Sequence, residues 1–184
     1  MQKKGLGFLL LAGLLIISAL VFLPSVRDSA QAQAGFNIHD AKVYGWLWSD
    51  NIGWIRLGTS TDNAIQIHDN SLTGYGWSDS VGWLDFAPAS GYPEAPNHGV
   101  QIESTPIGGT GDDYSVTGWV RACSVFVSGC SGALKDNTAR GDWDGWIKMT
   151  HAKYNRASKV FPGSSFAWGD LNLGWTNFHA GNPD

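Results

Sequence analysis

Apolar and polar residues alternate in short segments along the chain, and several of these segments begin at a Gly-Trp pair. In the segment that follows Gly53, Ile55 and Leu57 fall on one side of an extended strand, whereas Trp54 and Arg56 fall on the other. Alternation over so few residues is typical of a half-buried β-strand. Across the four such segments the pattern predicts a core side that consists of Ile55, Leu57, Leu84, Phe86, Ile147, Met149, Thr176 and Phe178.

The opposite side of the same strands places a tryptophan next to a charged or polar residue. One interpretation is that these rings pack against a neighbouring unit. The other is that they stay accessible as flat platforms for ligands that are part apolar and part hydroxyl, as sugars are. The candidate ligand-binding residues are therefore Trp54, Arg56, Trp83, Asp85, Trp146, Lys148, Trp175 and Asn177.

The Gly-Trp pairs recur at a regular distance. Trp54 and Trp83 are 29 residues apart, as are Trp146 and Trp175, and the middle gap of 63 residues holds one period plus an insertion. The spacing predicts an all-β domain of four tandem units, each with about three antiparallel strands. A propeller-like, a prism-like and a sandwich-like arrangement of these units all fit the pattern.

Each unit contains a tight hairpin between its second and third strands. In residues 48–54, with the sequence Trp-Ser-Asp-Asn-Ile-Gly-Trp, Asp and Asn favour the turn and Gly53 allows a positive φ. Trp48 and Trp54 are expected to lie opposite each other. We expect Trp48, Trp77 and Trp168 to be buried, because the residues that alternate with them are mostly small and let another layer approach.

Two units depart from this pattern. The fourth hairpin loop has one extra residue, which we expect to form a bulge. In the third unit Arg121 stands in place of the tryptophan, and an insertion over residues 122–140 contains Cys123 and Cys130. A disulfide between them fits an oxidising compartment. The insertion fits either a specificity element or a tolerated surface loop.

The N-terminal segment has a different character. Lys3 and Lys4 precede an apolar run of nineteen residues (5–23), and small residues up to Ala34 fit a cleavage site. This layout predicts a helical signal peptide over residues 1–34, with cleavage after Ala34, followed by a Trp/Gly-rich β domain over residues 35–184. The alternative is an uncleaved membrane anchor, since the run is long enough to span a bilayer.

Charge and motif content narrow the function classes. Residues 35–184 carry nine Lys and Arg and fifteen Asp and Glu, a net charge of −6, which disfavours nucleic acid as a partner. We expect no metal site and no cofactor, because no catalytic motif is present and the histidines lack metal-ligand spacing. The chain is therefore predicted not to be an enzyme.

The segments Gly-Tyr-Gly-Trp-Ser-Asp-Ser-Val-Gly-Trp-Leu-Asp-Phe (residues 74–86), Gly-Trp-Val-Arg-Ala-Cys (118–123) and Trp-Asp-Gly-Trp-Ile-Lys (143–148) carry a family resemblance. The chain resembles uncharacterised secreted Gly-Trp repeat proteins of uncultivated, small-genome bacteria, over most of residues 43–178. This resemblance implies export and a repeat role at the cell surface. Choline-binding and glucan-binding repeats also use Gly-Trp hairpins, but their periods are shorter and their ligand residues have no counterpart here.

The sequence thus favours a secreted or cell-surface binding module that adheres to polysaccharide or another surface polymer through its aromatic rings. One alternative is a structural envelope protein whose tryptophans only pack the repeats together, and a second is an enzyme of unknown reaction. Contact with a membrane is expected only through an uncleaved N-terminal segment. The oligomeric state does not follow from the sequence.

Overall fold

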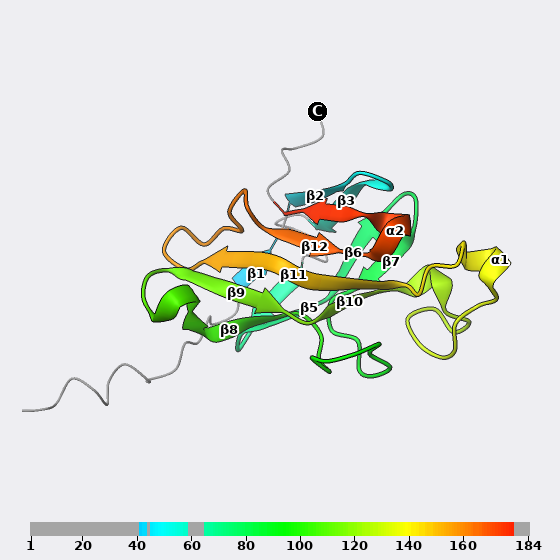
Figure 1. The fold of residues 1–184 in the computed structure, drawn as a ribbon, viewed down its shortest axis with the longest axis horizontal. Helices are drawn as coiled ribbons and strands as arrows, with labels where there is room; N and C mark the ends of the chain where they lie inside the picture. The colour runs from blue at the N-terminus through cyan, green and yellow to red at the C-terminus, as the bar shows by residue number, and fades with distance from the viewer. Residues whose placement is uncertain (1–40, 44, 59–64, 179–184) are drawn as a thin grey trace, which may run out of the picture. The chain divides into compact units, whose positions relative to one another are not determined.

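The computed structural model describes residues 41–43, 45–58 and 65–178. The predicted signal helix and the start of the predicted β domain lie outside this part. The described chain is mostly β, which confirms the expected class (Figure 1). Its strands are β1 (Ala41–Val43), β2 (Gly45–Ser49), β3 (Gly53–Gly58), β4 (Ile65–His68), β5 (Ser71–Thr73), β6 (Tyr75–Ser78), β7 (Gly82–Asp85), β8 (Gln101–Pro106), β9 (Asp113–Thr117), β10 (Trp119–Ala122), β11 (Trp146–Asn155), β12 (Phe166–Trp168) and β13 (Trp175–Asn177). Its helical turns are η1 (Ile107–Gly109), η2 (Cys123–Val125), α1 (Asn137–Arg140) and α2 (Asp170–Leu173).

Eight strands close into an antiparallel, barrel-like sheet. The order around it is β2, β3, β6, β7, β10, β11, β12 and β13, and the pairing of β13 with β2 completes the ring. A propeller, a prism and a sandwich were all compatible with the sequence. The structure differs from all three because neighbouring hairpins hydrogen-bond to each other through β3–β6, β7–β10 and β11–β12. Closure of this kind satisfies the strand edges within the ring.

A second group of strands continues from the ring. Its order is β1, β4, β5, β8, β9 and then β11, so β11 belongs to both parts of the sheet. The first half of β11 pairs with β10 and β12, and its last four residues pair with β9, from Ala152 opposite Val116 to Asn155 opposite Asp113. β11 is therefore one continuous strand from Trp146 to Asn155 that joins the two groups.

At two places a glycine interrupts the path of the chain between a strand of the second group and a hairpin of the ring. Gly74 lies between β5 and β6 with a φ of 106°, and Gly118 lies between β9 and β10 with a φ of 96°. A side chain at Gly118 would also collide with the carbonyl oxygen of Gly99. Only glycine adopts this backbone conformation freely. Each break therefore lets the chain pass from the second group of strands into the ring.

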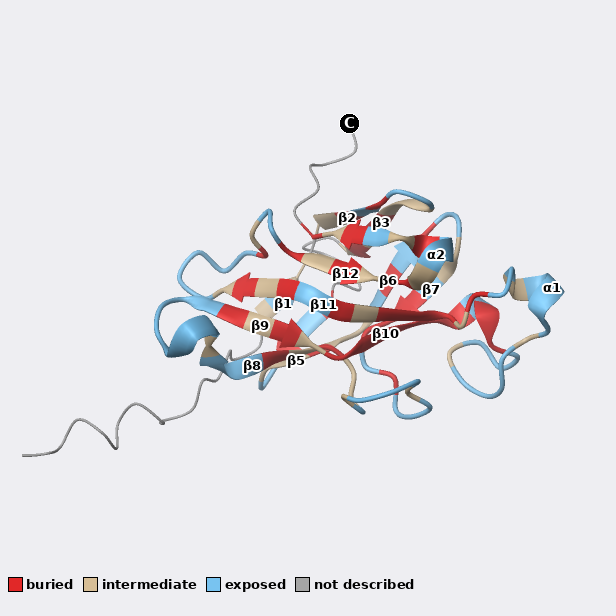
Figure 2. Ribbon diagram, viewed as in Figure 1, coloured by how far each residue is buried: buried red, intermediate tan, exposed pale blue. Residues whose placement is uncertain are grey.

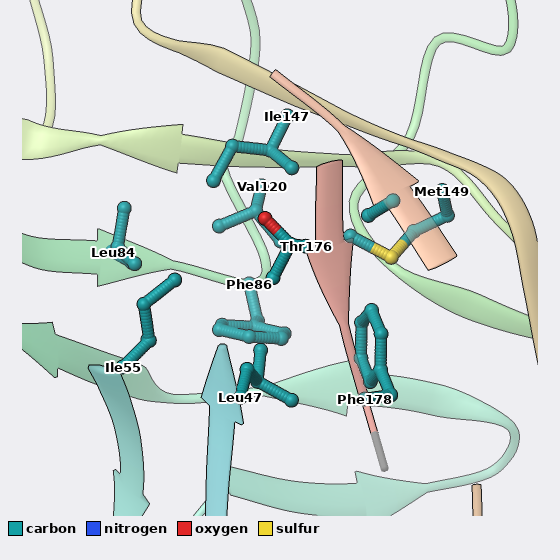
Figure 3. A pocket seen from close by; sticks show the side chains of 10 residues that line it. Leu47, Ile55, Leu84, Phe86, Val120, Ile147, Met149, Thr176 and Phe178 are labelled. Atoms are coloured by element: carbon teal, nitrogen blue, oxygen red, sulfur yellow. The ribbon is translucent and has the colours of Figure 1, made fainter. Parts of the chain in front are cut away.

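The interior of the ring is a packed apolar core. The eight residues predicted to face the core are all buried, which confirms that prediction, and Leu47, Val120 and Ala167 join them. Figure 2 shows the resulting alternation along β11, and Figure 3 shows the side chains that meet inside the ring. The remaining cavity is about 10 Å³, room for about one water molecule. A ligand of sugar size therefore has no place inside the ring.

The hairpin tips are joined at one end of the ring. The Ser49 hydroxyl donates to the carbonyl of Leu173 at 2.6 Å, and the Ser80 hydroxyl donates to that of Ile52 at 2.9 Å. The expected bulge in the fourth hairpin is wrong. Its extra residue is accommodated in the helical turn α2, which lets the Gly174 amide donate to the Asp170 carbonyl at 2.9 Å.

The insertion in the third unit is tied to itself. Cys123 and Cys130 form a disulfide, as the sequence predicted. Backbone hydrogen bonds from Val127 to Ala133 and from Lys135 to Val125 close the same loop. The side chains of Val125 and Phe126 are buried, so the insertion packs onto the domain as part of its core.

Candidate functional site

A cluster of three aromatic rings recurs on the outer side of the ring of strands. In the first hairpin Trp54 lies between Trp46 and Trp48, with centroid distances of 6.4 Å and 4.9 Å. The second and fourth hairpins repeat this arrangement with centroid distances of 6.3 Å and 4.9 Å each. We call the three clusters together the outer aromatic surface; they are Trp46–Trp54–Trp48, Tyr75–Trp83–Trp77 and Phe166–Trp175–Trp168.

Strand register explains the clusters. Trp48 is the direct cross-strand partner of Trp54, and such partners lie on the same face of a sheet. A turn residue then fixes the orientation of the first tryptophan side chain of each pair. The indole N–H of Trp48 donates to Asp50 at 3.2 Å, and that of Trp77 donates to Asp79 at 2.9 Å.

The outer aromatic surface is open to solvent at several rings. The exposed fractions of Trp48, Tyr75, Trp77, Trp83 and Trp175 lie between 38% and 47%.

The expectation that Trp48, Trp77 and Trp168 are buried is wrong, since the first two are exposed and Trp168 is half-buried. The small residues between the rings, such as Gly76 and Ala167, lie on the inner side of the ring of strands and do not admit a further outer layer.

Polar residues of the third strand in each unit lie between neighbouring clusters. Arg56 is the cross-strand partner of Trp46 on one side and of Trp77 on the other, and Trp77 in turn faces Trp83. Side chains one strand apart in such a row are separated by about 4.8 Å. In the described strands, four rows of this type wrap the ring: Phe166–Asn177–Trp48–Trp54, Trp46–Arg56–Trp77–Trp83, Tyr75–Asp85–Arg121–Trp146 and Trp119–Lys148–Trp168–Trp175.

The third row is covered by the chain itself from Asp85 to Trp146, whereas Tyr75 at its end stays exposed. Arg121, which replaces the usual tryptophan, packs its guanidinium 3.8 Å from the ring centroid of Phe126 and 5.2 Å from that of Trp146. It also donates to the carbonyl of Ser90 at 3.3 Å and to that of Gly132 at 3.2 Å. One side chain thus holds both segments that cover this row, the β7–β8 connection and the insertion.

Burial of the third row changes its ionisable groups. Desolvation raises the pKa of the Asp85 carboxyl, although the Ala87 amide and the Arg121 charge act in the opposite direction. Desolvation lowers the pKa of the Arg121 guanidinium, opposed by the charges of Asp85 and Tyr92. The two residues are cross-strand partners in the covered part of the row, so each charge opposes the effect of burial on the other.

The sequence-predicted candidates divide into two groups. Trp146, which is 4% exposed, and Asp85 are buried, so the expectation that they offer a ligand surface is corrected. The covering Tyr92 ring lies 5.5 Å from Trp146, and Glu94 forms an ion pair with Lys148. Six candidates line rows that include exposed rings: Trp54, Arg56, Trp83, Lys148, Trp175 and Asn177.

Sequence reasoning missed other exposed members of the surface. Tyr75 and Trp77 share the strand phase of their cluster, and the period-two pattern could have placed them outside. His151 lies with its ring centroid 5.8 Å from that of Trp175, a contact that no sequence pattern indicates.

The described residues contain no cluster of three or more His, Cys, Asp or Glu side chains that could hold a metal ion. Within the same part of the chain, no helix has the length and apolar character needed to cross a membrane. Comparison with protein-family models, with curated proteins and with solved structures found no match to this chain. Function is therefore inferred from the geometry of the residues.

Proposed function

We propose that the chain is a non-catalytic binding module whose outer aromatic surface binds polysaccharide or another cell-surface polymer. The observation that supports this most is the recurrence of one three-ring cluster on three neighbouring hairpins, with exposed rings in each. Exposed aromatic groups of this extent are unusual on a soluble domain without a partner. The packed interior of the ring leaves the outside as the place for a ligand.

The chemistry of the rows suits a sugar polymer. An indole face packs against the apolar face of a sugar, while neighbouring polar groups hydrogen-bond its hydroxyls. Arg56, Lys148 and Asn177 occupy that neighbouring position in three of the rows. Because one barrel presents several equivalent clusters, a polymer that contacts more than one of them would gain affinity by avidity.

The residues that we propose for binding differ from the sequence-based set. Asp85 and Trp146 are omitted because the covering segments bury them. The rings of Trp48, Tyr75 and Trp77 are added because they are exposed beside the original candidates. The proposed ligand-binding residues are Trp48, Trp54, Arg56, Tyr75, Trp77, Trp83, Lys148, Trp175 and Asn177.

We also propose that the domain consists of four tandem units and acts outside the cell or on its surface. The four units are supported by the equivalent cross-strand pairs Trp48–Trp54, Trp77–Trp83, Arg121–Trp146 and Trp168–Trp175. Export is supported by the signal-like pattern of residues 1–34 and by the disulfide, which fits an oxidising compartment.

A second candidate is a structural role in which the rings only stabilise the hairpins. Each exposed tryptophan is still more than half buried, and the rings within a cluster contact one another. Aromatic pairs of this kind contribute about 0.5–1.5 kcal/mol beyond the area that they bury.

A fluorescence titration distinguishes the two functions. Soluble envelope polysaccharides are added to residues 35–184, and tryptophan emission is expected to shift on binding. Trp83→Ala should weaken binding by about tenfold or more, as loss of a stacked ring typically does. Ile107→Ala removes an exposed apolar side chain from η1, away from the clusters, and should leave affinity unchanged. The structural candidate predicts instead no response to any polymer and a lower unfolding free energy for Trp83→Ala.

A further inference from the structure

A second hollow lies apart from the outer aromatic surface. It is a surface pocket of about 250 Å³ between the β7–β8 connection and the strands β5 and β8. Ser71 of β5 and Gln101 of β8 line one side, and Tyr92, Asn97 and His98 of the connection line the other. The β7–β8 connection can be followed in Figure 1.

The walls of this pocket are held by backbone hydrogen bonds. The Val100 amide donates to the carbonyl of Phe86 at 2.9 Å, and the Leu72 amide donates to the carbonyl of Val100 at 2.8 Å. Gly99 allows this approach, because a side chain there would lie 2.7 Å from the Phe86 carbonyl oxygen. One wall of the pocket is thus built on the sheet, and the β7–β8 connection forms the other wall.

The aromatic side chain of the pocket is also fixed. The Tyr92 hydroxyl donates to the carbonyl of Pro88, and its ring contacts Trp146. Since desolvation raises the pKa of Tyr92, its hydroxyl stays neutral over the physiological range. His98 donates through Nδ1 to the Gly99 carbonyl at 2.7 Å, because a carbonyl oxygen can only accept.

The side chains that line the pocket define the chemistry of its ligand. They include no Asp, Glu, Lys or Arg, but they offer a hydroxyl, two amides and an imidazole beside an aromatic ring and several apolar groups. Amides and hydroxyls both donate and accept, as the hydroxyls of a sugar do. The volume is below that of pockets for drug-sized ligands, which begin at about 300 Å³.

We infer that this pocket binds a single neutral sugar ring, with Asn97, Gln101 and Ser71 as hydrogen-bonding groups and Tyr92 as the apolar wall. The site is separate from the outer aromatic surface, and the inference does not depend on the proposed binding of a polymer there.

The test is isothermal titration of residues 35–184 with the methyl glycosides of glucose, galactose and N-acetylglucosamine. At least one of them should bind, and Asn97→Ala and Gln101→Ala should each weaken it by about fivefold or more, as loss of a hydrogen-bonding group does. Methyl glucuronoside, which carries a carboxylate, should bind at least fivefold more weakly than the neutral glycoside that binds most tightly. Absence of binding by all three neutral glycosides would overturn the inference, as would an equal affinity for the glucuronoside.

Two control variants make the result specific. Glu103→Ala removes an exposed side chain of β8 that does not line the pocket, so affinity for the glycoside should not change. Trp83→Ala removes a ring of the outer aromatic surface and should likewise leave glycoside binding intact. If the glycoside binds and the polymer does not, the proposed function fails and this inference stands. If the polymer binds and the glycosides do not, this inference fails and the proposed function stands.

Discussion

Arg121 shows how one residue can change a hairpin surface from exposed to covered. In the hairpins β2–β3, β6–β7 and β12–β13, a tryptophan occupies the cross-strand position that Arg121 has in β10, and it reaches solvent on the outer surface. A guanidinium has donors that point in several directions, so it can bind the carbonyls of Ser90 and Gly132 while stacking on Phe126. An indole has a single N–H and could not hold both covering segments.

Arg121→Ala should lower the unfolding free energy by about 3 kcal/mol, because two hydrogen bonds are lost and Asp85 stays buried without its neighbouring charge. Urea unfolding measures the loss. Lys159→Ala, at an exposed position, is the control and should change stability by less than about 0.5 kcal/mol. Equal stability of the two variants would contradict the role given to Arg121.

The raised pKa of Asp85 predicts a pH dependence of stability. The native state holds the Asp85 proton more tightly than the unfolded state does, so its contribution to stability is full below the unfolded pKa of about 3.9. That contribution is lost as the pH rises through the native pKa. Asp85→Asn keeps an oxygen that can accept from Ala87 but cannot ionise.

Unfolding free energies of the wild type and of Asp85→Asn, measured from pH 3 to pH 7, test this prediction. The difference should move in favour of the variant as the pH rises above about 4. A difference that stays constant would show that folding does not shift the pKa of Asp85, and one that moves in favour of the wild type would show that the native state stabilises the carboxylate; either result would contradict the prediction.

At the scale of elements, the glycine between two strands decides where the chain goes. Gly118 combines a φ of 96° with a close approach to the backbone of Gly99. Gly111 has a similar φ of 93°, but a methyl group at its Cα would have no neighbouring atom within 4 Å. A substitution at Gly111 therefore tests the cost of the positive φ alone, whereas one at Gly118 adds the cost of a steric collision.

Gly118→Ala should therefore destabilise the domain far more than Gly111→Ala. The left-handed conformation costs both variants about 1–2 kcal/mol, and the collision adds to this only at residue 118. Thermal unfolding of the two variants measures the difference. If both lose the same stability, the contact between residues 99 and 118 does not constrain the fold.

Some elements could be predicted from the alternation of residues and others could not. The third strand of each unit and its core side followed from period two, because strand side chains alternate faces regardless of the partner strand. The division into β9 and β10 could not be predicted, because the break at Gly118 depends on its contact with Gly99, which is distant in the sequence. Trp48 and Trp77 share a face with their cross-strand partners Trp54 and Trp83, so period two could have placed them on the outer side, whereas the closure of the strands into a ring does not follow from the pattern.

At the scale of the whole domain, the fold separates the apolar core from the outer surface that we propose for binding. The core inside the ring is apolar and filled, whereas the outer side repeats rings and polar residues. The third row has the same cross-strand register as the other rows. The same ring of strands therefore presents one covered row and three rows that we propose for binding. Exposed rings on a stable scaffold can then interact with a ligand without disturbing the core.

The most direct test is a titration followed through the indole N–H resonances of the ten tryptophans in a ¹⁵N-labelled sample of residues 35–184. On addition of a polysaccharide that binds, the resonances of Trp48, Trp77, Trp83 and Trp175 should shift, because these rings are exposed. Those of Trp119, Trp143 and Trp146 should stay in place, because these rings are buried. Shifts confined to the buried indoles, or none at all with any polymer, would contradict the assignment of the outer aromatic surface as the binding site.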